Sequence, residues 1–199
     1  MNVLLVAKDT GPSNALGRIL DVLRGHSDIT AHFLRQKLEI FSDAENEKMI
    51  RSLIDEPLET LDVVFTGMSS SPELAKNELT ACDAAVKAGI PLCLFADTFR
   101  AWARPWFEPY REAASALFVV SPAEAEKARE LFPNAKIVVS GNPTWEDFFF
   151  PKYTRSDVRT KLEIEDHESM IFVPGTKSLA VNMLLFGGVV EAAIMLGEA

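Results

Sequence analysis

Apolar residues form short continuous runs along this chain, and longer stretches with helical spacing separate the runs. The clearest example spans residues 61–97, where an apolar run at 62–66 precedes a helical stretch and a second run at 90–96. A serine-rich start at 69–73 and Gly89 at the end are typical helix boundaries. Two buried strands joined by a helix form a parallel, right-handed βαβ unit.

The same alternation continues on both sides of this unit. Further strands are predicted at residues 3–7, 29–34, 116–120 and 137–139, and further helices at 15–24, 44–55, 105–113 and 122–131. Ser13 or Asn14 is expected to cap the helix at 15–24, and Ser121 with Glu124 resembles a capping box. The pattern predicts an α/β fold, with a doubly wound, mainly parallel, Rossmann-like sheet. We expect the common strand order 3-2-1-4-5-6.

The alternation changes near Pro151, where a domain boundary is predicted. Residues 1–150 would form the Rossmann-like domain, and residues 151–199 would form a linker helix followed by a strand and a helix. The linker helix has a capping-box pattern at Thr154–Asp157, and the strand is predicted at 170–173.

The last predicted helix, Leu179–Leu196, is apolar on nearly all sides. Its length is that of a membrane span, and Glu191 is its one charged residue. Asn182, the pair Gly187-Gly188 and the absence of basic flanking residues favour a core helix over a membrane span. A helix of this kind is normally buried on most of its surface. We expect it to pack in a core, against a second copy of the chain or against a partner chain.

Composition and charge narrow the function classes. The chain has 199 residues, 48% hydrophobic and 25% charged, which is ordinary for a globular protein. A formal charge of −9 argues against nucleic acid and anionic membranes as partners. Cys82 and Cys93 fall in a predicted helix and a predicted strand, so buried, reduced thiols and a cytoplasmic location are expected.

Several familiar signatures are missing. No G-x-G-x-x-G or Walker A loop occurs, and no G-x-S-x-G elbow is present. The three histidines, His26, His32 and His167, have no metal-ligand spacing. We therefore expect neither a metal nor a tightly bound cofactor, and a small molecule is the expected ligand.

Open parallel sheets bind ligands at the carboxyl ends of their strands, where the strand order reverses. In the expected order, the first strand brings Asp9 and the fourth brings Asp97 to this place. Either aspartate is a candidate general base, and Asp97 is equally suited to capping its own loop. The candidate ligand-binding residues are Gly11, Pro12, Ser13, Asn14, Thr98, Arg100 and Trp102.

Three further features have competing interpretations. The Ser69–Ser71 turn is either a second anion-binding site or a simple helix cap. Capping is favoured if the preceding strand, at residues 62–66, lies at the sheet edge. Arg100, Trp102, Arg104 and Trp106 alternate cations with indoles, which suits either ligand stacking or loop packing. Gly175, Thr176 and Lys177 form a further phosphate-type turn.

Five short motifs together resemble nucleotide-sugar glycosyltransferases of the GT-B fold. The matching segments are residues 62–69, 89–91, Asp97, 119–122 and 139–143. The related sugar-nucleotide 2-epimerases share the outline. The resemblance implies an acceptor-binding first domain and a nucleotide sugar as co-substrate bound by a second domain. The sequence departs from the family after one strand and one helix of that second domain, where the donor-binding residues have no counterpart.

Three functions remain open from the sequence. The chain is the acceptor-binding half of a glycosyltransferase, a non-catalytic module that binds a sugar nucleotide or another phosphorylated ligand, or a subunit that docks a partner through Leu179–Leu196.

Overall fold

The computed structural model describes residues 1–35, 48, 61–176 and 178–197. The chain divides into two compact units, Met1–Phe150 and Pro151–Ala199, and each is described by itself. The helix predicted over 44–55 lies, apart from Lys48, outside the described residues, as does Lys177.

The first unit is built on one six-stranded sheet in which every neighbouring pair of strands is parallel. This confirms the predicted α/β, Rossmann-like fold. The strands are β1 (Asn2–Ala7), β2 (Thr30–Arg35), β3 (Val63–Gly67), β4 (Leu92–Phe95), β5 (Ala114–Val119) and β6 (Lys136–Val139). Their apolar runs predict burial on both faces, and Leu4, Val64 and Leu94 have no exposed surface.

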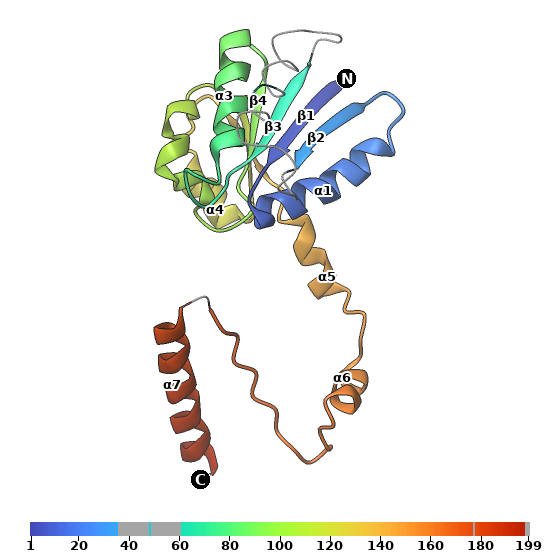
Figure 1. Cartoon of the computed structure of the whole chain (residues 1–199), viewed down its shortest axis with the longest axis vertical. Coiled ribbons are helices and arrows are strands. Elements are labelled where there is room, and N and C mark those ends of the chain that lie inside the picture. Colours follow the sequence, from blue (N-terminus) through green and yellow to red (C-terminus); the bar gives the residue numbers. More distant parts are fainter. Residues whose placement is uncertain (36–47, 49–60, 177, 198–199) are drawn as a thin grey trace. The chain divides into compact units, whose positions relative to one another are not determined.

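Helices cover both faces of this sheet (Figure 1). On one face α1 (Thr10–Arg24) packs against Leu5, Phe65 and Phe95. On the other face α3 (Lys76–Ala88) and α4 (Pro122–Ala128) enclose the larger core, which includes Met68, Leu117 and Phe132. Both cysteines are free, with Cys82 buried and Cys93 partly buried.

The observed strand order is β2-β1-β3-β4-β5-β6, so the expected order 3-2-1-4-5-6 is wrong. Strand β3 is central and pairs with β1 through Val3–Val63 to Val6–Thr66. The strand order therefore reverses between β1 and β3, and the loop that follows β3 lies at this crevice. Capping at Ser69–Ser71 is favoured only if β3 lies at the sheet edge, and β3 lies between β1 and β4 instead.

Three helices differ from the prediction in where they begin or in their type. Helix α1 is capped by Asp9, which accepts a hydrogen bond from the Thr10 N–H, so Ser13 and Asn14 lie inside the helix. Helix α3 begins at Lys76, after turns, and ends as expected at Gly89, whose φ of 68° suits glycine. The helix predicted over 105–113 is a pair of 3₁₀ helices, Ala101–Ala103 and Pro105–Tyr110.

After β6 the chain forms a short 3₁₀ helix, Pro143–Trp145, and then α5 (Glu146–Phe149). Asp147 of α5 forms an ion pair with Arg18 of α1, with Nη2 and Oδ2 2.8 Å apart. This contact places α5 beside α1 at the carboxyl edge of the sheet.

The second unit contains α6 (Arg155–Lys161) and α7 (Leu179–Gly197). The predicted capping box at Thr154 and Asp157 is present. The strand predicted at 170–173 is wrong, because these residues form no ladder within the described chain, and an apolar run becomes a strand only beside another strand. The described apolar side chains of α7 are largely exposed within this unit, and the expected packing of this helix against a second copy or a partner chain stays a prediction. None of the helices, within the residues described, has the length and apolar character needed to cross a membrane.

Candidate functional site

Two loops meet at the crevice between β1 and β3. Asp9 follows β1, and its carboxylate accepts hydrogen bonds from the backbone N–H and the hydroxyl of Ser70, which follows β3. In the opposite direction, the Asp9 N–H donates to Ser69 Oγ over 3.1 Å. Burial by itself would raise the pKa of Asp9, but the hydrogen bonds from Ser70 and Thr10 and the charge of Arg104 lower it below its ordinary value. Asp9 is therefore a fixed negative charge.

Glu78 of α3 lies beneath these two loops with no exposed surface. Its Oε1 accepts hydrogen bonds from the Lys8 N–H and from Ser69 Oγ, whereas its Oε2 is buried without a hydrogen-bond partner in the described structure. Burial raises the pKa of Glu78 to about 7, and the nearby charge of Asp9 adds to the rise. The side chain therefore changes protonation near neutral pH.

Asp97 follows β4, and its side chain lies against the first turn of α1. A methyl group added at Gly11 would lie 2.4 Å from Asp97 Oδ2, so glycine is what permits this approach. Asp97 is 7% exposed, and its Oδ1 is buried with no hydrogen-bond partner among the described residues. Burial raises the pKa of Asp97 to about 6, although the charge of Arg104 opposes the rise.

Arg104, in the loop after β4, supplies positive charge to this cluster. It interacts with Asp97, Asp9 and Glu78, and these charges raise its pKa, while burial has the larger effect and lowers it. Its Nη1 is buried without a hydrogen-bond partner in the part of the chain described. Three carboxyl groups and one guanidinium thus share the crevice. This acidic cluster comprises Asp9, Glu78, Asp97 and Arg104.

The two tryptophans of the alternating motif after Asp97 mainly pack the loop. Trp102 is 6% exposed, and its Nε1 donates to Glu124 Oε2 over 2.7 Å. The Arg100 N–H donates to the same oxygen. Trp106 Nε1 donates to the Ser69 carbonyl over 3.1 Å. Almost none of the Trp102 indole is left exposed for a ligand, and Glu124 holds this loop instead of completing the expected capping box.

The remaining predicted ligand residues are spread over different surroundings. Pro12 and Ser13 are buried, and Ser13 Oγ is without a hydrogen-bond partner in the described structure. Gly11, Asn14 and Arg100 are exposed, and Thr98 is half-buried. Gly175 and Thr176 belong to the second unit, where Thr176 is hydrogen bonded to Asn182. The structure brings Asp9, Gly11, Ser69 and Asp97 together in the first unit. The catalytic and ligand-binding roles of all the candidate residues stay predictions.

Two members of the acidic cluster were not proposed from sequence as site residues. Glu78 has a signal that could have identified it: it shares a helix face with the buried residues Ala81, Cys82 and Ala85, at spacings of three, four and seven. A carboxylate on such an apolar face requires a reason. Arg104 was recognised only as part of the alternating motif, because its approach to Asp97 depends on the loop.

The cluster combines a fixed carboxylate with two carboxyl groups that titrate near neutral pH. Such groups at the crevice of a parallel sheet are suited to proton transfer. Among the residues that the structure describes, no group of three or more histidine, cysteine, aspartate or glutamate side chains could hold a metal ion. The single guanidinium among three carboxyl groups makes the cluster a poor place for a diphosphate.

Comparisons with known proteins give structural relatives at low sequence identity. No protein-family model matches the chain, and no curated protein matches it by sequence. One similar solved structure is the S. aureus MnaA–UDP complex, with 11% identity and a TM-score of 0.58 over 81% of this chain and 50% of that one. Another is a UDP-N-acetylglucosamine 2-epimerase, with 12% identity and a TM-score of 0.55 over 78% of this chain and 52% of that one. The chain spans about half the length of each, and the likeness supports the fold.

Proposed function

We propose that this chain is the acceptor-binding half of a nucleotide-sugar-dependent glycosyl-transfer enzyme, with Asp97 as the general base. The observation that carries the proposal is the state of Asp97. Its carboxyl group is buried, has one oxygen without a hydrogen-bond partner in the described structure, and has a pKa raised to about 6 by burial. A general base works best with a pKa near the operating pH and a free lone pair.

In this reaction the acceptor hydroxyl attacks the anomeric carbon of the donor sugar. The O–H bond breaks as its proton passes to Asp97, the new glycosidic C–O bond forms, and the nucleotide leaves with the electrons of the broken C–O bond. Arg104 interacts with Asp97 and favours its ionised form. The diphosphate of the donor would lie outside the acidic cluster, because phosphate groups repel carboxylates. We infer that a second domain, of which residues 151–199 form the beginning, binds the donor.

The structural neighbours favour a second candidate function, epimerisation of a sugar nucleotide. In that reaction the unpartnered oxygen of Asp97 would take a proton from a ring carbon of the sugar, the electron pair of the broken C–H bond would stay on the sugar, and a proton from water would then bind that carbon from the opposite face. The two reactions differ in their products. Transfer releases the nucleotide and joins the sugar to an acceptor, whereas epimerisation carried out in D₂O introduces deuterium at the carbon that changes configuration.

The test replaces Asp97 by asparagine, which keeps the shape of the side chain but cannot accept the proton. In a protein that joins this chain to the complete donor-binding domain, and with a panel of UDP-sugars and alcohol or sugar acceptors, D97N should lower kcat by about 10²-fold or more. The rate of the unaltered protein should rise with pH through about 6 and then level off, because the ionised carboxylate is the active form.

Asp28→Asn, at an exposed position, is the matched control and should retain full activity. Unchanged turnover in D97N would remove Asp97 from the role of base. Deuterium incorporation without nucleotide release would favour the epimerase. Binding of a UDP-sugar with neither reaction would make the chain a binding module.

A further inference from the structure

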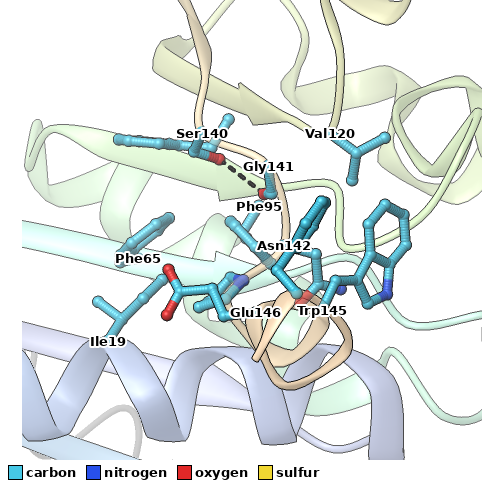
Figure 2. Close-up of a pocket in the computed structure, with 12 residues that line it drawn as sticks. Ile19, Phe65, Phe95, Val120, Ser140, Gly141, Asn142, Trp145 and Glu146 are labelled. Carbon is cyan, nitrogen blue, oxygen red and sulfur yellow. Dashed lines mark hydrogen bonds between the residues drawn. The ribbon is translucent and has the colours of Figure 1, made fainter. Parts of the chain in front are cut away.

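An apolar cavity lies on the α1 face of the sheet, at the carboxyl ends of β3 to β6. It has a volume of about 550 Å³, within the range typical of small-molecule sites. Strand residues form its floor, α1 contributes Ile19, and the segment after β6 contributes Trp145, Glu146 and Phe149 (Figure 2). All the lining residues belong to the first unit.

The floor of the cavity is aromatic. Phe65, Phe95 and Phe118 come from three neighbouring strands, and the ring of Phe65 lies 6.2 Å from that of Phe95 and 4.9 Å from that of Phe118. Phe95 has no exposed surface and Phe65 is 8% exposed, so the partly buried Phe118 presents most of the aromatic surface to the cavity, although parallel sheets are normally covered on both faces. A further flat ring placed here would extend this group with edge or offset contacts, which aromatic pairs prefer.

Glu146 is the one charged residue among the described residues that line the cavity. Its carboxylate points toward Ile19 and Phe65, whereas the indole of Trp145 lies toward Val120 (Figure 2). The amide of Asn142 is already engaged, since it donates to the Asp97 carbonyl and accepts from Thr144. The ligand should therefore offer an O–H or N–H donor to Glu146, and a negative charge on it would be repelled.

Two contacts join this cavity to the loop that follows β4. The Asn142 side chain, which lines the cavity, donates to the Asp97 carbonyl over 2.7 Å. The indole of Trp145 lies against the ring of Phe99, with centroids 5.9 Å apart. The cavity is thus adjacent to the Asp97 loop but has a different chemical character from the acidic cluster.

We propose that this cavity is a second ligand site, which binds a neutral or cationic aromatic group that carries a hydroxyl or amine. The inference rests on the aromatic floor, the volume, and the single carboxylate at one side. It does not depend on the reaction proposed for Asp97, and it adds a ligand class that the acidic cluster by itself does not select.

Isothermal titration calorimetry with 2-naphthol as the probe tests the proposal on the full chain. Ser140 lines the cavity and is exposed, so Ser140→Phe should fill the space and weaken 2-naphthol binding at least tenfold. Ser115→Phe, on an exposed position of β5 outside the cavity, is the matched control and should bind like the unaltered protein. Phe149 lines the cavity and is exposed, so Phe149→Ala should also weaken 2-naphthol binding and serves as a second test if Ser140→Phe folds poorly.

Charge provides an independent readout. The anionic analogue 2-naphthalenesulfonate should bind the unaltered protein about fivefold more weakly than 2-naphthol, as expected for one unit charge about 4 Å from a solvated carboxylate. Glu146→Gln should remove most of that preference. Equal binding of both probes, no 2-naphthol binding, or undiminished binding to both Ser140→Phe and Phe149→Ala would overturn the proposal.

Asp97→Asn separates this inference from the proposed reaction, because the variant should bind 2-naphthol normally. Probe binding together with full turnover in D97N would leave the cavity site standing and reject the base. Loss of turnover in D97N, together with no 2-naphthol binding to the unaltered protein, would support Asp97 as the base and reject the cavity site.

Discussion

At the scale of single residues, Glu78 is the most informative side chain. It is fully buried, it joins the loops after β1 and β3, and burial raises its pKa to about 7. A carboxyl group with a raised pKa holds its proton in the folded protein at a pH where the unfolded chain has lost it. The free energy of unfolding therefore falls as pH rises from the ordinary carboxyl pKa to about 7, and then levels off.

Glu78→Gln should remove this pH dependence and keep the hydrogen-bond acceptor. The free energy of unfolding of the unaltered protein, measured relative to the variant, should fall by about 2 to 3 kcal/mol between pH 5 and pH 8. Most of the fall occurs below pH 7, where the slope approaches about 1.4 kcal/mol per pH unit. Urea denaturation at a series of pH values measures it. Glu112→Gln, at an exposed position, should show no such trend. A constant difference between the Glu78 variant and the unaltered protein would show that Glu78 does not titrate in this range.

At the scale of elements, Glu124 fixes the loop that carries Arg104. Glu124 lies on α4 and is 5% exposed. Its carboxylate accepts hydrogen bonds from the Arg100 N–H and from the Trp102 indole. Glu124→Ala would leave these donors unsatisfied. The expected loss is about 2 to 3 kcal/mol of unfolding free energy, typical of hydrogen bonds to a buried charged group.

Denaturant unfolding measures this loss, and Glu126→Ala on the exposed side of the same helix is the control, with an expected change within about 0.5 kcal/mol. Hydrogen exchange at residues 100–104 should also become faster in the Glu124 variant. A loss no larger than that of the Glu126 variant would mean that the loop is held by packing alone.

The strands of the sheet could be predicted from the sequence more completely than the candidate site could. Apolar runs identified all six strands of the sheet. The signal is most continuous in the inner strands, which are buried on both faces, whereas the edge strand β6 is only partly buried. Strand order could not be read in this way, since β3 has the same apolar character in a central position as at another place in the sheet. That error made the Ser69 turn look remote from the crevice.

The site depended on contacts between residues far apart in the sequence. The sequence led us to expect Gly11 to face Asp97 because it placed β1 beside β4, whereas β3 lies between them in the sheet. The structure still places Gly11 beside Asp97, but the expected strand order does not explain this contact. The contacts of Glu78 with the loops after β1 and β3, and those of Arg104 with the carboxyl groups, depend on how loops fold in three dimensions. The spacing of apolar residues does not predict such contacts. The apolar run at 170–173 was predicted to be a strand but forms none. A strand needs a neighbouring strand to pair with, and the described residues offer none to this run.

At the scale of the whole molecule, the first unit contains everything that the proposed sites require. The sheet, both cores, the acidic cluster and the aromatic cavity lie within Met1–Phe150. We propose that this unit is an independent domain and that residues 151–199 belong to a second one. A fragment of residues 1–150 should then unfold cooperatively, with an unfolding free energy within about 1 kcal/mol of the corresponding transition in the full chain.

A fragment that ends at Val139 is the sharper comparison. It lacks the Asn142 hydrogen bond to the Asp97 carbonyl and the Asp147 ion pair with Arg18, so it should be less stable and should not bind 2-naphthol. Circular dichroism during urea denaturation measures both fragments. If residues 1–150 fail to fold while the full chain folds, the second unit is required for the first, and the proposed boundary at Pro151 is not a domain boundary. If both fragments are equally stable, the segment after β6 closes the cavity without supporting the sheet.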